Sequence, residues 1–161
     1  MRLFLALWPD ACTRRAVADW QMQWLWPSGA RLVPPDQLHL TMHFIGQVDA
    51  QQLPLLKQGL AVAFEPFELE LGHAEQWSGG LALLSPQQPP EVMHALHARM
   101  ADALRALDLE VETRPFRPHL TLARRAVGAT PPAERLQCRW PIKGYALVQS
   151  LQGYRPLQQY G

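Results

Sequence analysis

The tripeptide His-Leu-Thr occurs twice in this sequence, as His39-Leu40-Thr41 and as His119-Leu120-Thr121, 80 positions apart (119 − 39). Each copy lies in a run of residues that is typical of a β-strand. Because side chains alternate across a strand, the histidine and threonine of one copy share a face, about 6 to 7 Å apart along the backbone. An imidazole can give or take a proton near neutral pH, and a hydroxyl can hydrogen-bond a charged oxygen. Two copies therefore indicate one active site built from two halves.

The residues around both copies carry a resemblance to a known family. The first copy lies in the segment 33–46 (VPPDQLHLTMHFIG), and the second in 116–124 (FRPHLTLAR), which is the better match. The opening residues 2–7 (RLFLAL) are similar to the family's first strand. These segments resemble the 2H phosphoesterases, which are defined by two His-x-Thr/Ser-x motifs. Within them the chain looks most like the RNA 2',3'-cyclic phosphodiesterases, also called 2'-5' RNA ligases.

This resemblance implies a fold. It predicts an α+β protein with two lobes, in which two antiparallel sheets face a central cleft and helices pack outside. Residues 1–161 would then form a single domain whose two lobes are pseudo-symmetric. The alternation of expected strands with few helices also favours the mixed α+β class over a doubly wound parallel sheet.

The resemblance also implies roles for five residues. His119 would be the general base on the attacking water, and His39 the general acid that protonates the leaving O3'. Thr41 and Thr121 would hydrogen-bond the non-bridging phosphate oxygens, and Arg124 would balance their charge. Arg124 has the opposite strand parity to His119, so its arrival at the site requires a strand end or a β-bulge.

The function implied is hydrolysis of RNA 2',3'-cyclic phosphate ends to 2'-phosphomonoesters, without a metal or a cofactor. A 5'-hydroxyl of RNA replacing water would give reversible 2'-5' ligation by the same groups. One alternative is a 2H enzyme acting on another cyclic nucleotide or an ADP-ribose cyclic phosphate, which would keep every catalytic residue. The other is a non-catalytic RNA-end binding module. The presence of both histidines and both threonines argues against such a module.

Composition excludes some classes of protein. The length of 161 residues fits one domain of ordinary size. No apolar run reaches the 18 or so residues that span a bilayer, and no leader precedes the first strand. We therefore expect a cytoplasmic protein that needs no membrane. Cys12 and Cys138 form no CxxC or Cys/His cluster, which argues against a disulfide framework or a structural zinc.

The charge distribution is uneven although the net charge is only +1. Residues 1–80 hold 5 basic and 8 acidic side chains, whereas residues 110–143 hold 7 basic and 3 acidic ones. The region of the second motif would attract phosphates, unless this is only an ordinary solvated surface. We expect RNA with a 2',3'-cyclic phosphate end, or a cyclic nucleotide, as the partner of a monomer.

The apolar periodicity predicts the secondary structure. Strands are expected at 2–8, 38–45, 67–71, 81–84, 109–113, 119–123, 144–151 and 154–160, and helices at 10–24, 49–64 and 90–107. Trp20 and Trp24 recur at helical spacing and are expected in the core rather than at a ligand.

The remaining histidines receive no catalytic role. His94 and His97 are three residues apart on the third expected helix, but no carboxylate or cysteine completes a metal site, so both are expected on the surface. His73 is expected to be exposed near a strand end.

His43 is one departure from the family pattern. It shares a strand face with His39, about 13 Å away, so it would either line the mouth of the cleft or be exposed. Phe4 and Phe44 are candidates to stack on a base, or else members of the core.

Overall fold

The computed structural model describes all 161 residues. Nine strands and three α-helices, with two short 3-10 helices at Pro35–Gln37 and Ala50–Gln52, follow one another along the chain. They are β1 (Arg2–Leu7), α1 (Ala11–Gln21), β2 (Arg31–Leu32), β3 (Leu40–Gln47), α2 (Leu53–Gly59), β4 (Phe67–Trp77), β5 (Leu81–Gln87), α3 (Glu91–Ala106), β6 (Leu120–Arg124), β7 (Cys138–Ile142), β8 (Tyr145–Ser150) and β9 (Tyr154–Tyr160).

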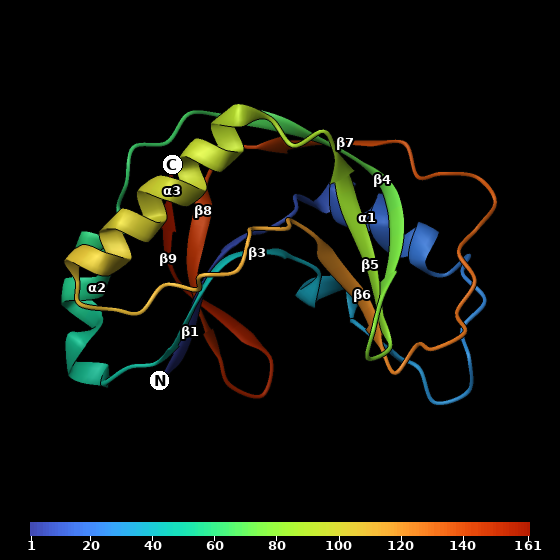
Figure 1. The fold of residues 1–161 in the computed structure, drawn as a ribbon, viewed down its shortest axis with the longest axis horizontal. Coiled ribbons are helices and arrows are strands. Elements are labelled where there is room, and N and C mark those ends of the chain that lie inside the picture. Colours follow the sequence, from blue (N-terminus) through green and yellow to red (C-terminus); the bar gives the residue numbers. More distant parts are fainter.

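All strands belong to one antiparallel sheet, in the order β7-β4-β5-β6-β3-β1-β8-β9 with β2 beside β6. β3 and β6 pair only through Leu40 and Leu120, so the sheet divides there into two halves. We call β3, β1, β8 and β9 the first-motif half, and β6, β5, β4, β7 and β2 the second-motif half. Figure 1 shows them on the left and the right of the curled molecule. The α+β class is confirmed, and the two expected sheets are continuous through one residue pair.

A strand-helix-strand unit occurs twice in the chain. β1, α1 and β3 form the first unit, and β5, α3 and β6 form the second. The helices begin at Ala11 and Glu91 (91 − 11 = 80), and the motif strands at Leu40 and Leu120 (120 − 40 = 80). Each helix crosses over: α1 contacts β7 of the second-motif half, and α3 contacts β3 of the first-motif half. The repeat seen in two tripeptides therefore extends to whole elements.

Each motif strand contains a β-bulge at the same place. Leu5 pairs with His43 and Ala6 with Thr41, so Met42 is an extra residue in β3. In β6, Leu122 is extra in the same way between Thr121 and Ala123, which pair with β5. A bulge reverses the alternation of side chains beyond it. Both strands accordingly begin with the same burial pattern, in which the third and fourth residues are buried and the fifth is exposed.

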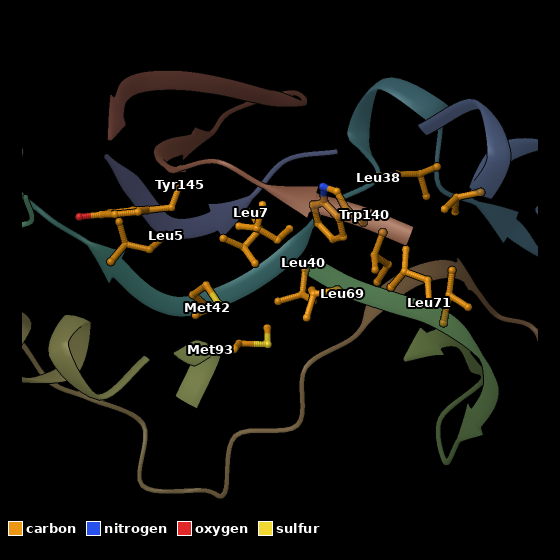
Figure 2. Close-up of a cluster of buried hydrophobic side chains, with 14 of the residues drawn as sticks. Leu5, Leu7, Leu38, Leu40, Met42, Leu69, Leu71, Met93, Trp140 and Tyr145 are labelled. Carbon is orange, nitrogen blue, oxygen red and sulfur yellow. The ribbon is translucent and has the colours of Figure 1, made fainter. Parts of the chain in front are cut away.

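The hydrophobic core runs through both halves. It contains 30 buried residues, including Leu5 and Leu7 of the first-motif half and Leu69 and Leu84 of the second. In Figure 2 the side chain of Leu40 lies among core residues contributed by both halves. Trp20 and Trp24 are buried in this core, as expected. No helix is long and apolar enough to cross a membrane.

Two expected elements differ in the structure, and β2 and β7 were not expected. The helix expected at 49–64 is shortened to a 3-10 turn and α2, which ends at Gly59, a residue of low helix propensity. Residues 109–113 form no strand. β7 contains Pro141 and was not among the expected strands; it is an edge strand and pairs only with β4. Proline is tolerated on an edge because no neighbour needs its missing N–H.

Candidate active site

The pairing of Leu40 with Leu120 brings the two motifs side by side. Both leucines are fully buried, so the residues that flank them lie on the opposite face of the sheet. We call this the motif face; it carries a histidine and a threonine from each strand: His39, Thr41, His119 and Thr121. In an antiparallel pair centred on the leucines, the histidine of one motif is opposite the threonine of the other. The predicted assembly of one site from two halves thus has a structural basis.

Both motif histidines are held in the same tautomer. The Nδ1–H of His39 donates to the carbonyl of Gln37, 2.7 Å away, and that of His119 donates to the carbonyl of Arg117, also 2.7 Å away. A carbonyl can only accept, so Nδ1 carries the proton and Nε2 is the atom that titrates. Nε2 of His39 lies 3.1 Å from the hydroxyl of Thr41. Each ring therefore presents one reactive nitrogen.

Burial lowers the pKa of both imidazoles. The pKa of His39 falls below its usual range through burial and through the positive charges of His119 and Arg124, although the hydrogen bond with Gln37 partly opposes this. The pKa of His119 is also lowered by burial, while the hydrogen bond with Arg117 and the charge of Glu75 act in the opposite direction. His119 is thus close enough to influence the protonation of His39.

Arg124 reaches the same site through the bulge in β6. It is exposed at the end of the strand, and the extra residue Leu122 reverses its strand parity relative to Thr121. Its positive charge lowers the pKa of both His39 and His119. The β-bulge that Arg124 was expected to need is therefore present in β6.

Aromatic side chains surround His39. Trp8 stacks on its ring with 4.9 Å between centroids, and Tyr154 meets it edge-on, also at 4.9 Å. Phe4 is buried behind it at 5.1 Å, whereas Phe44 is 60% exposed and lies 6.3 Å from Phe4. Phe44 occupies the place in the first motif that Arg124 occupies in the second (124 − 44 = 80). Of the two phenylalanines, only Phe44 has a face open to a ligand.

The surroundings of His119 are different. Its ring lies 4.6 Å from that of Trp77, the last residue of β4, and the Arg117 guanidinium lies 4.3 Å above the same indole. Glu75 is 3.9 Å from Arg117. Sequence reasoning missed Trp77 and also Trp8 and Tyr154. Trp8 directly follows the strand 2–7, and that strand pairs with the first motif strand. Its place in the sequence was therefore a usable signal that Trp8 lies near the site.

The expectation for His43 and His97 was wrong. His43 is buried rather than exposed or at a cleft mouth, because the bulge at Met42 turns it toward α3. It stacks on His97 at 3.9 Å, and His97 stacks on Phe116 at the same distance. His97 is therefore half-buried, not a surface residue. His94 and His73 are exposed as expected, although His73 lies 3.9 Å from Glu75.

Gln21, another residue that sequence reasoning missed, supports the bulge in β6. Its side-chain amide donates to the carbonyl of Leu122, 2.8 Å away, and to that of Val33, 3.0 Å away. The residue after the bulge in β3 is held from α3 instead, where Nε2 of His43 hydrogen-bonds the carbonyl of His97, 2.9 Å away. A buried glutamine on an otherwise apolar helix face was the available signal.

The structure contains no group of three His, Cys, Asp or Glu side chains placed to hold a metal ion. The two motifs and Arg124 together supply two imidazoles, two hydroxyls and one guanidinium. Such a set can move protons at two points while holding an anion between them.

The family model and the relatives that match this chain agree with one another. Residues 8–152 match the family model of the 2'-5' RNA ligase superfamily. The chain is 32% identical over 170 residues to an RNA 2',3'-cyclic phosphodiesterase of Thermus thermophilus, covering 93% of this chain and 82% of that protein. It is 32% identical over 127 residues to the Escherichia coli enzyme of the same name, covering 78% and 72%.

Among solved structures, Escherichia coli LigT complexed with 3'-AMP superposes with a TM-score of 0.86 at 28% identity, covering 98% of this chain and 95% of that one. The family match spans nearly the whole chain and includes both His-x-Thr motifs. On this basis the chain belongs to the 2'-5' RNA ligase superfamily, within the 2H phosphoesterases.

Proposed function

We propose that this protein hydrolyses 2',3'-cyclic phosphate ends of RNA to 2'-phosphomonoesters by general acid and base catalysis between two histidines. The observation that carries the proposal is the pairing of Leu40 with Leu120, which aligns the two motifs on one face of the sheet. The relatives named RNA 2',3'-cyclic phosphodiesterase support the choice of substrate.

The reaction needs a proton removed on one side of phosphorus and a proton supplied on the other. Water attacks in line with the departing oxygen, so the two proton-transfer groups must lie on opposite sides. We assign His119 as the base on the water and His39 as the acid that protonates O3'. Glu75 then stabilises the imidazolium that forms on His119, in keeping with its effect on the pKa of that ring.

The phosphate is held by three further side chains. Thr41 and Thr121 donate hydrogen bonds to the non-bridging oxygens, and Arg124 balances the charge that builds up on them. Each threonine lies on the same face as its motif histidine. The assignment of Arg124 is supported by its electrostatic effect on both rings.

The base of the terminal nucleotide stacks in the first-motif half. Phe44 is suited to this contact because its ring is exposed, and Tyr154 presents a second aromatic ring nearby. Phe4 is buried below His39 and supports that ring instead of touching the base.

We also propose that the protein acts as a monomer in the cytoplasm and that a 5'-hydroxyl of RNA can replace water, giving reversible 2'-5' ligation. Both motifs come from one chain, so the site needs no second copy. Size-exclusion chromatography with light scattering tests the monomer, and cell fractionation tests the location.

The proposed function is tested with a panel of purified substrates in the absence of added metal. The panel contains an RNA ending in a 2',3'-cyclic phosphate, a 3',5'-cyclic nucleotide and an ADP-ribose cyclic phosphate. We expect the RNA end to have the highest kcat/KM. Higher kcat/KM on another member would reassign the substrate within the 2H enzymes, and binding of the RNA end without turnover would indicate a binding module.

A further inference from the structure

The two sides of the motif face offer different surfaces to a nucleic acid. The first-motif half presents aromatic rings around His39. Beside His119 the indole of Trp77 is covered by the guanidinium of Arg117, whose central carbon lies 4.3 Å from the centroid of the ring. The chemistry proposed above uses neither of these two side chains.

Arg117 presents a planar cation to solvent at this point. Its side chain is 62% exposed although the guanidinium lies over the Trp77 ring. Glu75 approaches it at 3.9 Å, which leaves most of the guanidinium free of a close ion pair. The Nε1–H of Trp77 is buried without an acceptor, so no hydrogen bond of its own accounts for the position of the indole.

A guanidinium plane backed by an aromatic ring is a stacking surface for a nucleobase. Arginine stacks on bases through its delocalised plane, and such stacking accepts any base because every base has a π-face. The same residue also attracts the phosphates of a strand. Arg117 lies in the basic region 110–143, so the surrounding charge favours a polyanion.

The position beside His119 identifies which nucleoside would bind there. In an in-line reaction the entering and leaving oxygens lie on opposite sides of phosphorus. The terminal nucleoside stays attached to the oxygen that His39 protonates, so it lies on the first-motif side. An alcohol activated by His119 enters from the other side, and its nucleoside extends toward Trp77 and Arg117.

We infer that Trp77 and Arg117 form a second nucleoside site, which holds the RNA strand whose 5'-hydroxyl replaces water in ligation. This inference rests on the proposed function. Hydrolysis leaves the site empty because water carries no nucleoside. Ligation and its reverse, cleavage of a 2',5' linkage, both fill it.

The reverse reaction gives a direct assay. In a 2',5'-linked dinucleotide, the O3' attacks phosphorus and gives its proton to His39. The P–O3' bond forms, the P–O5' bond breaks, and His119 supplies a proton to the departing O5'. The products are a nucleoside 2',3'-cyclic phosphate and a nucleoside with a free 5'-hydroxyl, and no other reactant is needed.

The test compares two leaving groups on the wild-type protein and on Arg117→Ala. One substrate is 2',5'-linked adenylyl-adenosine, and the other replaces the leaving adenosine with an abasic riboside. We expect the leaving base to raise kcat/KM about 5-fold or more in the wild type, the lower range of base stacking. In Arg117→Ala this advantage should fall below about 2-fold. If Arg117→Ala only disturbed His119, kcat/KM would fall equally for both substrates, and the ratio of the two kcat/KM values would not change.

Arg114→Ala is the matched control, since Arg114 is an exposed arginine three residues earlier that pairs with Glu112. It should keep the wild-type ratio. Arg117→Gln retains the length of the side chain without the charged plane, and serves if Arg117→Ala folds poorly. A ratio near one in the wild type, or a ratio unchanged in both Arg117 variants, would overturn the second site.

Adenosine 2',3'-cyclic phosphate is measured in parallel to separate the two proposals. If the wild type hydrolyses it but does not cleave the dinucleotide, the proposed function stands and the second site is overturned. If it acts on neither, the proposed function fails and the second site fails with it.

Discussion

His39 and His119 occupy equivalent positions in two copies of one motif, yet their neighbours differ. Each ring donates through Nδ1 to the carbonyl two residues before it, which fixes Nε2 as the reactive atom. His39 stacks on Trp8, whereas His119 lies near Glu75 and Arg117. The two imidazole rings are thus oriented in the same way but have different neighbours. An acid and a base that act on one phosphate need such a difference, because one ring must be protonated while the other is neutral.

Replacing either histidine by alanine should abolish most turnover without unfolding the protein. Loss of a general acid or base typically lowers the rate about 10² to 10⁴-fold. We expect His39→Ala and His119→Ala each to lose activity in this range, with circular dichroism and thermal unfolding close to wild type. His94→Ala, at an exposed histidine, serves as the control. Near wild-type turnover in a folded variant would remove that histidine from the mechanism.

The pH dependence of kcat/KM should be bell-shaped, because one imidazole must be neutral while the other is protonated. The pKa values of His39 and His119 are both lowered by burial from the ordinary 6.5. Both limbs should therefore lie on the acid side, with a maximum below about pH 6.5 and falling rates above it. Initial rates at low substrate concentration from pH 4 to 9 measure this. A rate that rises steadily to pH 9 is incompatible with the assignment.

At the scale of elements, the two bulges place the site residues. The bulges at Met42 and Leu122 put Phe44 and Arg124 on the motif face, and each is supported from a helix that crosses over from the other strand-helix-strand unit. Gln21 is the clearest support, since its amide donates to two main-chain carbonyls, that of Leu122 in the interior and that of Val33 near the surface.

Gln21→Leu should destabilise the protein by about 1 to 3 kcal/mol, because the variant loses two side-chain hydrogen bonds, one of them fully buried. For a chain of this size, that corresponds to a fall in Tm of roughly 2 to 4 °C per kcal/mol. Gln23→Leu is the matched control, an exposed glutamine two positions further on. Calorimetry compares the two variants, and equal Tm values would mean that Gln21 does not support the bulge.

The stack of His43 on His97 should make the fold sensitive to acid. Burial and the neighbouring His43 lower the pKa of His97 to about 4, below the 6.5 expected when unfolded. The unfolded chain then binds more protons between those values, so stability is complete above pH 6.5 and declines toward pH 4. We expect the Tm of His97→Gln to fall less over this interval than that of the wild type. A parallel decline would show that other groups control acid unfolding.

The sequence predicted which motif residues come together better than it predicted what surrounds them. The repeated tripeptide predicted that His39 and His119 would share one site. Strand alternation, which depends only on local sequence, predicted that each histidine lies on the same face as its own threonine. The burial of His43 was not predictable, since a bulge depends on the strand that pairs with it. Trp77 lies 42 residues before His119 (119 − 77), and only the pairing of β4 with β5 and of β5 with β6 brings it near.

At the scale of the whole molecule, one core joins the two halves. Leu40 and Leu120 belong to the same buried cluster and are the only residues through which β3 pairs with β6. The distance between the motifs is thus set by packing in the core. We propose that residues 1–161 fold as one domain with two lobes related by the repeat, and a second unfolding transition would contradict this.

The identity of the product from an RNA with a 2',3'-cyclic phosphate end, in excess EDTA, tests the two-histidine mechanism most directly. The site offers no three ligands for one metal ion, so we expect full activity in the chelator. Protonation of O3' by His39 should leave a 2'-phosphate, which resists a 3'-specific phosphatase and is removed by a general one. Loss of activity restored by a divalent ion, or complete release by the 3'-specific enzyme, would contradict the mechanism or the assigned roles of His39 and His119.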